Sequence, residues 1–213
     1  MGKKRVLCFG DSLTWGFDPY KRVRMEDEDR WTGVLQKHLG SDYVVIEEGH
    51  NGRTIATDDP AEGEKNGLKY IGPCMESHTP FDFLIIMLGI NDCKRKYAYS
   101  SMDIAGEMQI LLEKVQAYNR FRCKDAFKVL LVSPPPVSEA IIDSWLGDSF
   151  GFENAVKVSN ELADWYKSLA DMYDCEYLDA AEYVKASKAD GVHLDAEEQR
   201  KLGTIIAECI KRR

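Results

Sequence analysis

A chain of 213 residues is long enough to bury one sizeable core and short for two. Its 44% hydrophobic and 30% charged residues are ordinary for a globular protein and argue against a disordered chain. The net charge of −8, without a local cluster of lysine and arginine, argues against a nucleic-acid partner, and no apolar stretch reaches the roughly 20 residues of a membrane-spanning helix.

Short β-rich runs alternate with helical stretches along the chain. Arg5 to Phe9 is a compact apolar run that predicts a first strand, and apolar residues at helical spacing predict a helix over 31–39. Further strands are predicted at Tyr43 to Ile46, Phe83 to Leu88, Lys128 to Val132 and Glu176 to Leu178. Further helices are predicted at Ile104 to Tyr118, Glu153 to Met172 and Glu197 to Ile210.

This alternation predicts the fold class. Phe83 to Leu88 is apolar on both faces, which is typical of a strand in the middle of a parallel sheet. Thr57 to Tyr70, rich in Asp, Glu, Gly and Lys, predicts a long surface loop. Right-handed crossovers between the strands imply an α/β fold, a three-layer α/β/α sandwich with a five-stranded parallel sheet of the flavodoxin-like type. We expect one domain over residues 1–213.

The cysteines and the amino terminus bear on location. The six cysteines are scattered, without the paired short spacings of zinc or redox sites, and several lie in apolar runs where a cysteine is usually buried. The amino terminus runs straight into the first strand rather than into an apolar signal region. We therefore expect a reduced, cytoplasmic protein that uses no metal or cofactor and binds no membrane.

Four polar segments marked by glycine carry the chemistry. In open α/β sheets, ligands bind outside the carboxyl ends of the strands, so the residues just after each strand are informative. Three segments follow predicted strands and the fourth precedes the last helix: residues 10–16, 49–53, 89–92 and 190–193. The topology predicts that they meet at one edge of the sheet.

Together these segments offer every part of a serine-hydrolase mechanism. Ser12 is the predicted nucleophile and His193 its base, and Asp190, three residues earlier, is placed to orient the imidazole. The predicted oxyanion donors are the main-chain N–H groups of Ser12 and Gly52 and the side-chain amide of Asn91. No metal-ligand spacing and no phosphate-binding glycine loop competes with this interpretation.

The four segments resemble, in order and over essentially the whole chain, the sequence blocks of the SGNH hydrolases, also called the GDSL esterase/lipase family. In this resemblance Ser12, Gly52, Asn91 and His193 correspond to the four residues that name the family, and Asp190 to its triad acid. Further phrases are similar to the bacterial arylesterase branch that includes acyltransferases and perhydrolases: Gly10 to Gly16, Arg30 to Leu35, Ile46 to Gly49, Ile85 to Gly89 and Val132 to Pro136.

That resemblance implies a small-molecule ester substrate with a short acyl group and an aryl or alkyl alcohol. It also implies a homo-oligomer, since the branch includes homo-octamers. The chain departs from the branch at Phe17 to Asp29, which is shorter and strongly charged. Leu13, Trp15 and Ile90 flank the motif residues and are our predicted walls of the acyl pocket, with core packing as the alternative for Trp15 and Ile90.

Each motif residue has a simpler alternative. Ser12 is of a type that caps helices, and Asn91 and Gly52 are of types that favour turns. Asp11 and Asp92 are expected to tie loops together rather than to act in catalysis. Gly147 to Gly151 matches the Gly-x-Ser-x-Gly nucleophile pattern at Ser149, but the strand that this motif requires does not precede it.

The sequence therefore predicts a serine esterase for short-chain acyl esters, acting through an acyl-enzyme. Acyl transfer or perhydrolysis would follow if an alcohol or peroxide replaced water. One alternative is a carbohydrate O-deacetylase that uses the same residues. The other is a catalytically silent binding module, because a fold alone does not specify a function.

Overall fold

Five parallel strands form one sheet in the computed structural model, which describes residues 2–212. Their order across the sheet is β2-β1-β3-β4-β5. The strands span Lys4–Gly10 (β1), Tyr43–Gly49 (β2), Phe83–Met87 (β3), Lys128–Ser133 (β4) and Glu176–Asp179 (β5). All four pairings are parallel, which confirms the predicted five-stranded parallel sheet.

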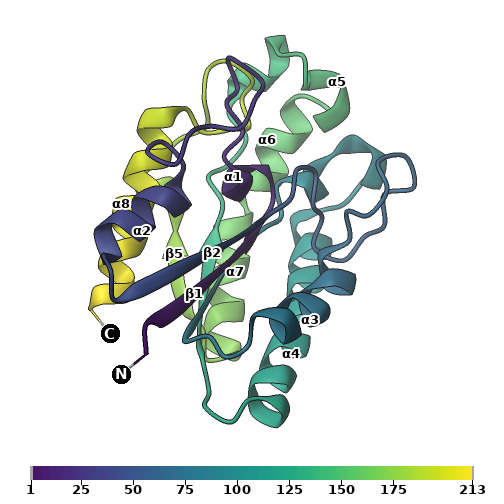
Figure 1. Cartoon of the computed structure of the whole chain (residues 1–213). Helices are drawn as coiled ribbons and strands as arrows, with labels where there is room; N and C mark the ends of the chain where they lie inside the picture. Colours follow the sequence, from purple (N-terminus) through teal and green to yellow (C-terminus); the bar gives the residue numbers. More distant parts are fainter. Residues whose placement is uncertain (1, 213) are drawn as a thin grey trace.

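Helices cover both faces of this sheet (Figure 1), with α2 and α8 packed together on one face and α3, α4 and α7 on the other. The α-helices span Ser12–Trp15 (α1), Trp31–Leu39 (α2), Gly67–His78 (α3), Ser101–Arg122 (α4), Gly147–Phe150 (α5), Glu153–Asn160 (α6), Leu162–Met172 (α7) and Ala196–Lys211 (α8). Short 3-10 helices span Asn91–Cys93 (η1), Arg95–Tyr97 (η2), Glu139–Asp143 (η3) and Ala180–Glu182 (η4). This arrangement is the predicted three-layer sandwich. Within residues 2–212, no helix combines the length and apolar character that crossing a bilayer requires.

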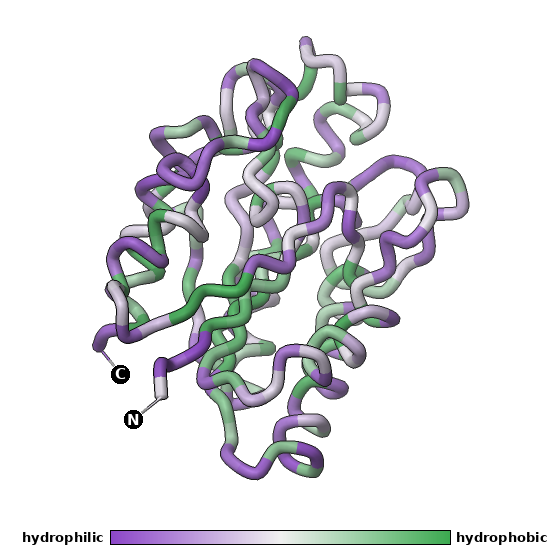
Figure 2. The backbone as a smooth tube through the Cα atoms, viewed as in Figure 1, coloured by the Kyte–Doolittle hydropathy of each residue, from purple (hydrophilic) through white to green (hydrophobic). Residues whose placement is uncertain are grey.

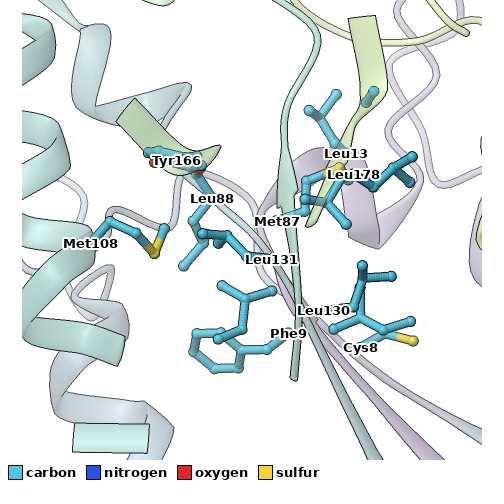
Figure 3. Close-up of a cluster of buried hydrophobic side chains, with 14 of the residues drawn as sticks. Cys8, Phe9, Leu13, Met87, Leu88, Met108, Leu130, Leu131, Tyr166 and Leu178 are labelled. Atoms are coloured by element: carbon cyan, nitrogen blue, oxygen red, sulfur yellow. The ribbon is translucent and has the colours of Figure 1, made fainter. Parts of the chain in front are cut away.

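The core lies along the central strands. All five residues of β3 are buried, because helices cover the sheet on both sides of it. Apolar residues gather in the strands and polar residues follow the outer helices and loops (Figure 2). Buried side chains pack on both sides of the strands, with Leu13 beside Leu178 on one side and Tyr166 beside Leu88 on the other (Figure 3).

The strand order places a crevice between β1 and β3. The chain moves outward from β1 to β2 and then returns to the other side of β1 with β3, which makes this the topological switch point of the sheet. Gly10 at the end of β1 pairs with both Gly49 and Met87. The segments that follow these three strands therefore leave the sheet at the same level, at the end where α1 lies in Figure 1.

Two predicted elements need correction. The predicted surface loop from Thr57 to Tyr70 is wrong at its end, because α3 begins at Gly67 and continues to His78, a helix that the sequence did not predict. Two glycines and Pro73 weaken the intrinsic helix signal, but Ile71, Cys74 and Met75 on one side of α3 are buried, so packing decides the helix. The predicted helix from Glu153 to Met172 is two helices, separated where the Glu161 N–H turns to the Val158 carbonyl.

Candidate active site

Ser12, His193 and Asp190 form a hydrogen-bonded line at the switch point. Ser12 opens α1 directly after β1, and His193 lies in the loop before α8. The Ser12 Oγ is 2.9 Å from Nε2 of His193, and the Nδ1 of His193 is 2.7 Å from Oδ2 of Asp190. All three residues are buried. This is the order of contacts that a serine nucleophile, a base and an orienting carboxylate require.

A tight turn aims Asp190 at the imidazole. Its Oδ1 accepts the main-chain N–H groups of Val192 and His193, which leaves Oδ2 for the His193 ring. Gly191 has a φ of +78°, and a Cβ there would lie 2.4 Å from the Ile141 nitrogen, so glycine is required. Burial alone would raise the pKa of Asp190, but the hydrogen bonds and charge of His193 and the main-chain donors hold that pKa below its ordinary value.

The three predicted oxyanion donors lie around the same pocket as the Ser12 hydroxyl. Among residues 2–212, the main-chain N–H groups of Ser12 and Gly52 donate to no protein acceptor, so they are free to bind a ligand oxygen. Gly52 has a φ of +78°, and a Cβ there would lie 2.8 Å from Oε2 of Glu62. Asn91, in η1, donates from Nδ2 to the Arg53 carbonyl at 3.1 Å, which ties its loop to the one that carries Gly52.

Asp11 and Asp92 hold these loops together through hydrogen bonds, as the sequence led us to expect. Asp11 accepts the Leu13 N–H through Oδ1 and, at 3.3 Å, the Asn91 amide through Oδ2. Burial raises the pKa of Asp11 to about 6. Asp92 accepts the Ile55 N–H and so joins η1 to the segment after β2. Neither carboxyl lines the pocket.

A pocket of about 360 Å³ opens onto the Ser12 hydroxyl. One wall is mostly apolar and comes from three segments: Phe17, Trp145, Leu146, Phe150 and Val192. The Phe17 ring packs against the imidazole of His193, with ring centroids 4.4 Å apart. A further part of the lining is polar and consists of Asn51, Glu62, Lys65 and Lys94. The pocket therefore presents an apolar surface to one part of a ligand and charges to another.

The predicted acyl-pocket residues lie elsewhere. Leu13 and Ile90 are buried in the core, where Figure 3 shows Leu13 beside Met87 and Leu178. Trp15 is partly buried, with the Arg24 guanidinium 5.5 Å from its ring. None of the three lines the pocket. The turn after β1 packs on β1 and β2, and the turn after β3 packs on α4 and α6, so closeness to a motif residue in sequence did not predict orientation.

Ser149 does line the pocket but has no catalytic partner. It lies in the short helix α5, exposed, and no strand precedes it. Within residues 2–212 its hydroxyl makes no hydrogen bond. His50 is also unsuited as a base, because Nε2 lies 3.3 Å from Nζ of Lys65 and burial lowers its pKa. The geometry favours Ser12 and His193 over both alternatives.

The charged residues of the pocket, Glu62, Lys65 and Lys94, were not predicted from the sequence; we call them the charged wall. Lys94 follows Asn91 by three residues, its side chain is only 8% exposed, and Nζ lies 3.2 Å from Oε1 of Glu62. Lys65 donates from Nζ to the Asn51 carbonyl at 2.8 Å. The short sequence distance from Asn91 to Lys94 could have indicated that Lys94 lies near the site. The loop that carries Glu62 and Lys65 has no hydrophobic periodicity, so its path could not be predicted.

Comparisons with known proteins agree with this geometry. Residues 8–201 match the GDSL-like lipase/acylhydrolase family. Among solved structures, a carbohydrate acetylesterase from Sinorhizobium meliloti is 39% identical with a TM-score of 0.92, covering 99% of each chain. An aryl esterase from M. smegmatis is 38% identical with a TM-score of 0.91, covering 98% of this chain and 99% of that chain. A putative arylesterase from Agrobacterium tumefaciens is 34% identical with a TM-score of 0.89, at the same coverage. No curated protein sequence matches the chain.

Proposed function

Because this chain belongs to the GDSL-like lipase/acylhydrolase family and is an ester hydrolase, we propose that it is a serine esterase for short-chain acyl esters of aryl or alkyl alcohols. Ser12 is its nucleophile, His193 its base and Asp190 its orienting carboxylate. The observation that carries this proposal is the unbroken line of hydrogen bonds from the Ser12 Oγ through His193 to Asp190.

In acylation, the Ser12 Oγ attacks the ester carbonyl carbon while its proton passes to Nε2 of His193. Asp190 keeps the other ring proton on Nδ1 and stabilises the imidazolium that forms. The carbonyl oxygen gains negative charge, which the free N–H groups of Ser12 and Gly52 and the Asn91 amide are placed to stabilise. When the tetrahedral intermediate collapses, His193 protonates the departing alkoxide and the acyl group remains on Ser12.

Deacylation repeats these steps with a second nucleophile. His193 takes a proton from water, the resulting hydroxide equivalent attacks the acyl carbon, and Ser12 leaves with its proton restored. An alcohol or hydrogen peroxide in place of water would give acyl transfer or perhydrolysis by the same route. We include both acceptors in the proposed function. Product analysis in the presence of added ethanol or peroxide measures how much of the acyl-enzyme reacts with each acceptor and how much reacts with water.

The pocket supports short substrates. A volume of about 360 Å³ is near the lower end of the range for small-molecule sites, and aromatic side chains border the serine. The relative from M. smegmatis is named an aryl esterase, which agrees with an apolar alcohol group lying along Phe17 and Trp145.

A carbohydrate O-deacetylase is the second candidate, favoured by the charged wall. Glu62, Lys65 and Lys94 offer donors and acceptors that suit sugar hydroxyls, and one similar structure is named a carbohydrate acetylesterase. The kcat/KM for an acetylated sugar, compared with that for phenyl acetate, distinguishes the candidates. Lys65→Met lowers only the sugar activity if the charged wall binds the sugar.

The deciding experiment compares p-nitrophenyl acetate turnover by wild type, Ser12→Ala and Ser149→Ala. We expect Ser12→Ala to lose a factor of about 10⁴ or more in kcat and Ser149→Ala to stay near wild type. A serine-directed phosphonate should label only Ser12. Wild-type turnover in Ser12→Ala would overturn the proposed nucleophile, and absence of both turnover and labelling in wild type would point to a silent binding module.

A further inference from the structure

A second cluster of reactive side chains lies outside the catalytic pocket, between strand β2 and helix α3. Glu48 comes from β2, and Cys74 and His78 come from α3. One ligand atom from each residue lies within 4.8 Å of the others. Cys74 and His78 are four residues apart and so share one face of the helix, opposite the Glu48 carboxylate. None of the three belongs to the esterase machinery described above.

We propose that Glu48, Cys74 and His78 form a binding site for a divalent transition metal, with Zn²⁺ as the best match. A thiolate, an imidazole and a carboxylate are the three donor types that zinc takes in proteins. Thiolate and imidazole also disfavour Mg²⁺ and Ca²⁺, which prefer oxygen ligands. Three protein ligands leave the fourth tetrahedral position to water.

The cluster is buried on the side of Cys74 and partly exposed to solvent on the side of Glu48 and His78. Cys74 is 1% exposed, and its thiol has no hydrogen-bond partner within residues 2–212. The side chains of Glu48 and His78 are 18% and 26% exposed, with 2.7 Å between Oε1 and Nε2. The Tyr70 hydroxyl donates to the other Glu48 oxygen at 3.2 Å. An ion would therefore approach from the Glu48 and His78 side and meet the buried sulfur beneath.

Metal binding requires the three ligand atoms to move slightly closer together and the cluster to lose one proton. Zinc bonds of about 2.0–2.3 Å set neighbouring ligand atoms roughly 3.2–3.8 Å apart, so the sulfur moves inward by about 1 Å while the Glu48–His78 hydrogen bond opens. The Cys74 thiol releases its proton to solvent, and the Nε2 proton of a neutral His78 ring moves to Nδ1. Because binding releases the thiol proton, apparent affinity should rise with pH.

Arg53 is the nearby cation that opposes an incoming metal. Its guanidinium is held by the Gly10 and Glu48 carbonyls and lies over the rings of Phe9 and Tyr70, 4.3 and 5.2 Å from their centroids. It occupies none of the ligand positions. A Cys74 thiolate and the Glu48 carboxylate together carry two negative charges, which match those of the divalent ion and offset the repulsion.

A cobalt titration of the full chain tests the site, because Co²⁺ enters zinc sites and reports its ligands spectroscopically. We expect one Co²⁺ per chain, a near-ultraviolet band from sulfur-to-cobalt charge transfer, visible bands of tetrahedral intensity, and displacement by Zn²⁺. Cys74→Ser should lose the charge-transfer band, and His78→Gln should weaken binding at least about tenfold. At one zinc concentration, zinc should raise the Tm of wild type by more than it raises that of His78→Gln.

Matched controls are Cys123→Ser and His38→Gln, which change the same residue types away from the cluster and should bind like wild type. Ester turnover reports folding in every variant. If Cys74→Ser does not fold, the partly exposed His78→Gln carries the same test. No cobalt binding by wild type at micromolar protein, or binding with an unchanged spectrum in either cluster variant, would overturn the proposal.

Discussion

At the scale of single residues, the side-chain amide of Asn91 makes two hydrogen bonds within the protein and is also a proposed oxyanion donor. One Nδ2 proton holds the Arg53 carbonyl at 3.1 Å, and the other reaches Oδ2 of Asp11 at a longer 3.3 Å. The weaker contact is the one that an oxyanion in the pocket can replace at least cost. In the proposed mechanism, the Asn91 amide is therefore held in position before substrate binds and forms its bond to the oxyanion in the transition state.

We expect Asn91→Ala to lower kcat by about 10²–10³ with little change in KM, because an oxyanion donor acts mainly on the transition state. Steady-state kinetics with p-nitrophenyl acetate measure both constants. Asn160→Ala, which removes an exposed amide bound only to a carbonyl of its own helix, is the control. A kcat near wild type in Asn91→Ala would assign the oxyanion to the two main-chain donors alone.

At the scale of elements, Asp59 organises the acidic loop that carries the charged wall. Its buried carboxylate accepts the main-chain N–H groups of Ala61 and Glu62, bonds to the Tyr97 hydroxyl and pairs with Lys96. Burial opposes ionisation, but the hydrogen bonds from Lys96 and Tyr97 lower the pKa of Asp59 to about 2. The loop is thus attached to η2 through one ionised group.

The lowered pKa of Asp59 makes its contribution to the free energy of unfolding depend on pH. Because folding lowers the pKa of Asp59 from its ordinary 3.8 to about 2, the ionised group stabilises the fold above pH 3.8 and loses this contribution as the pH falls toward 2. We expect Asp59→Asn to cost about 2 kcal/mol of unfolding free energy at pH 7 and clearly less near pH 2.5. Urea unfolding followed by circular dichroism measures the difference, with the exposed Asp171→Asn as control. An equal cost at both pH values would contradict the electrostatic explanation.

At the scale of the whole molecule, exposed apolar side chains gather beside the pocket. Tyr20, Val23 and Trp145 are exposed, and the Arg22 guanidinium lies 4.7 Å from the Trp145 ring, which joins their two segments. Apolar surface of this kind is typical of contacts between proteins. We propose that the chain self-associates through this face into the oligomer that the sequence led us to expect.

Light scattering coupled to size-exclusion chromatography measures the mass directly. We expect a multiple of the chain mass for wild type and a shift toward the single chain for Val23→Asp, which places a charge in the apolar contact. The exposed Met172→Asp, on α7, is the control. A single-chain mass for wild type at working concentrations would contradict self-association.

The sequence by itself determined the family, the five strands along the chain and the segments that meet at the switch point, but not helix α3 or the break between α6 and α7. Parallel strands bring their carboxyl ends to one edge whatever the details of packing, so Ser12, Gly52 and Asn91 follow from where their strands end. The Asp190–His193 pair is local, since one turn brings the carboxylate to the ring. These relationships depend on chain direction and short spacing, which can be read from the sequence.

Only the tertiary structure decided which side chains line the pocket at Ser12. Leu13 and Ile90 turn into the core, while Phe17, Trp145 and Lys94 form the pocket walls. The Glu48, Cys74 and His78 cluster likewise exists only once α3 packs beside β2. Loop paths and the packing of one element against another depend on many weak long-range contacts whose sum no local pattern contains, so these features appear only in the folded chain.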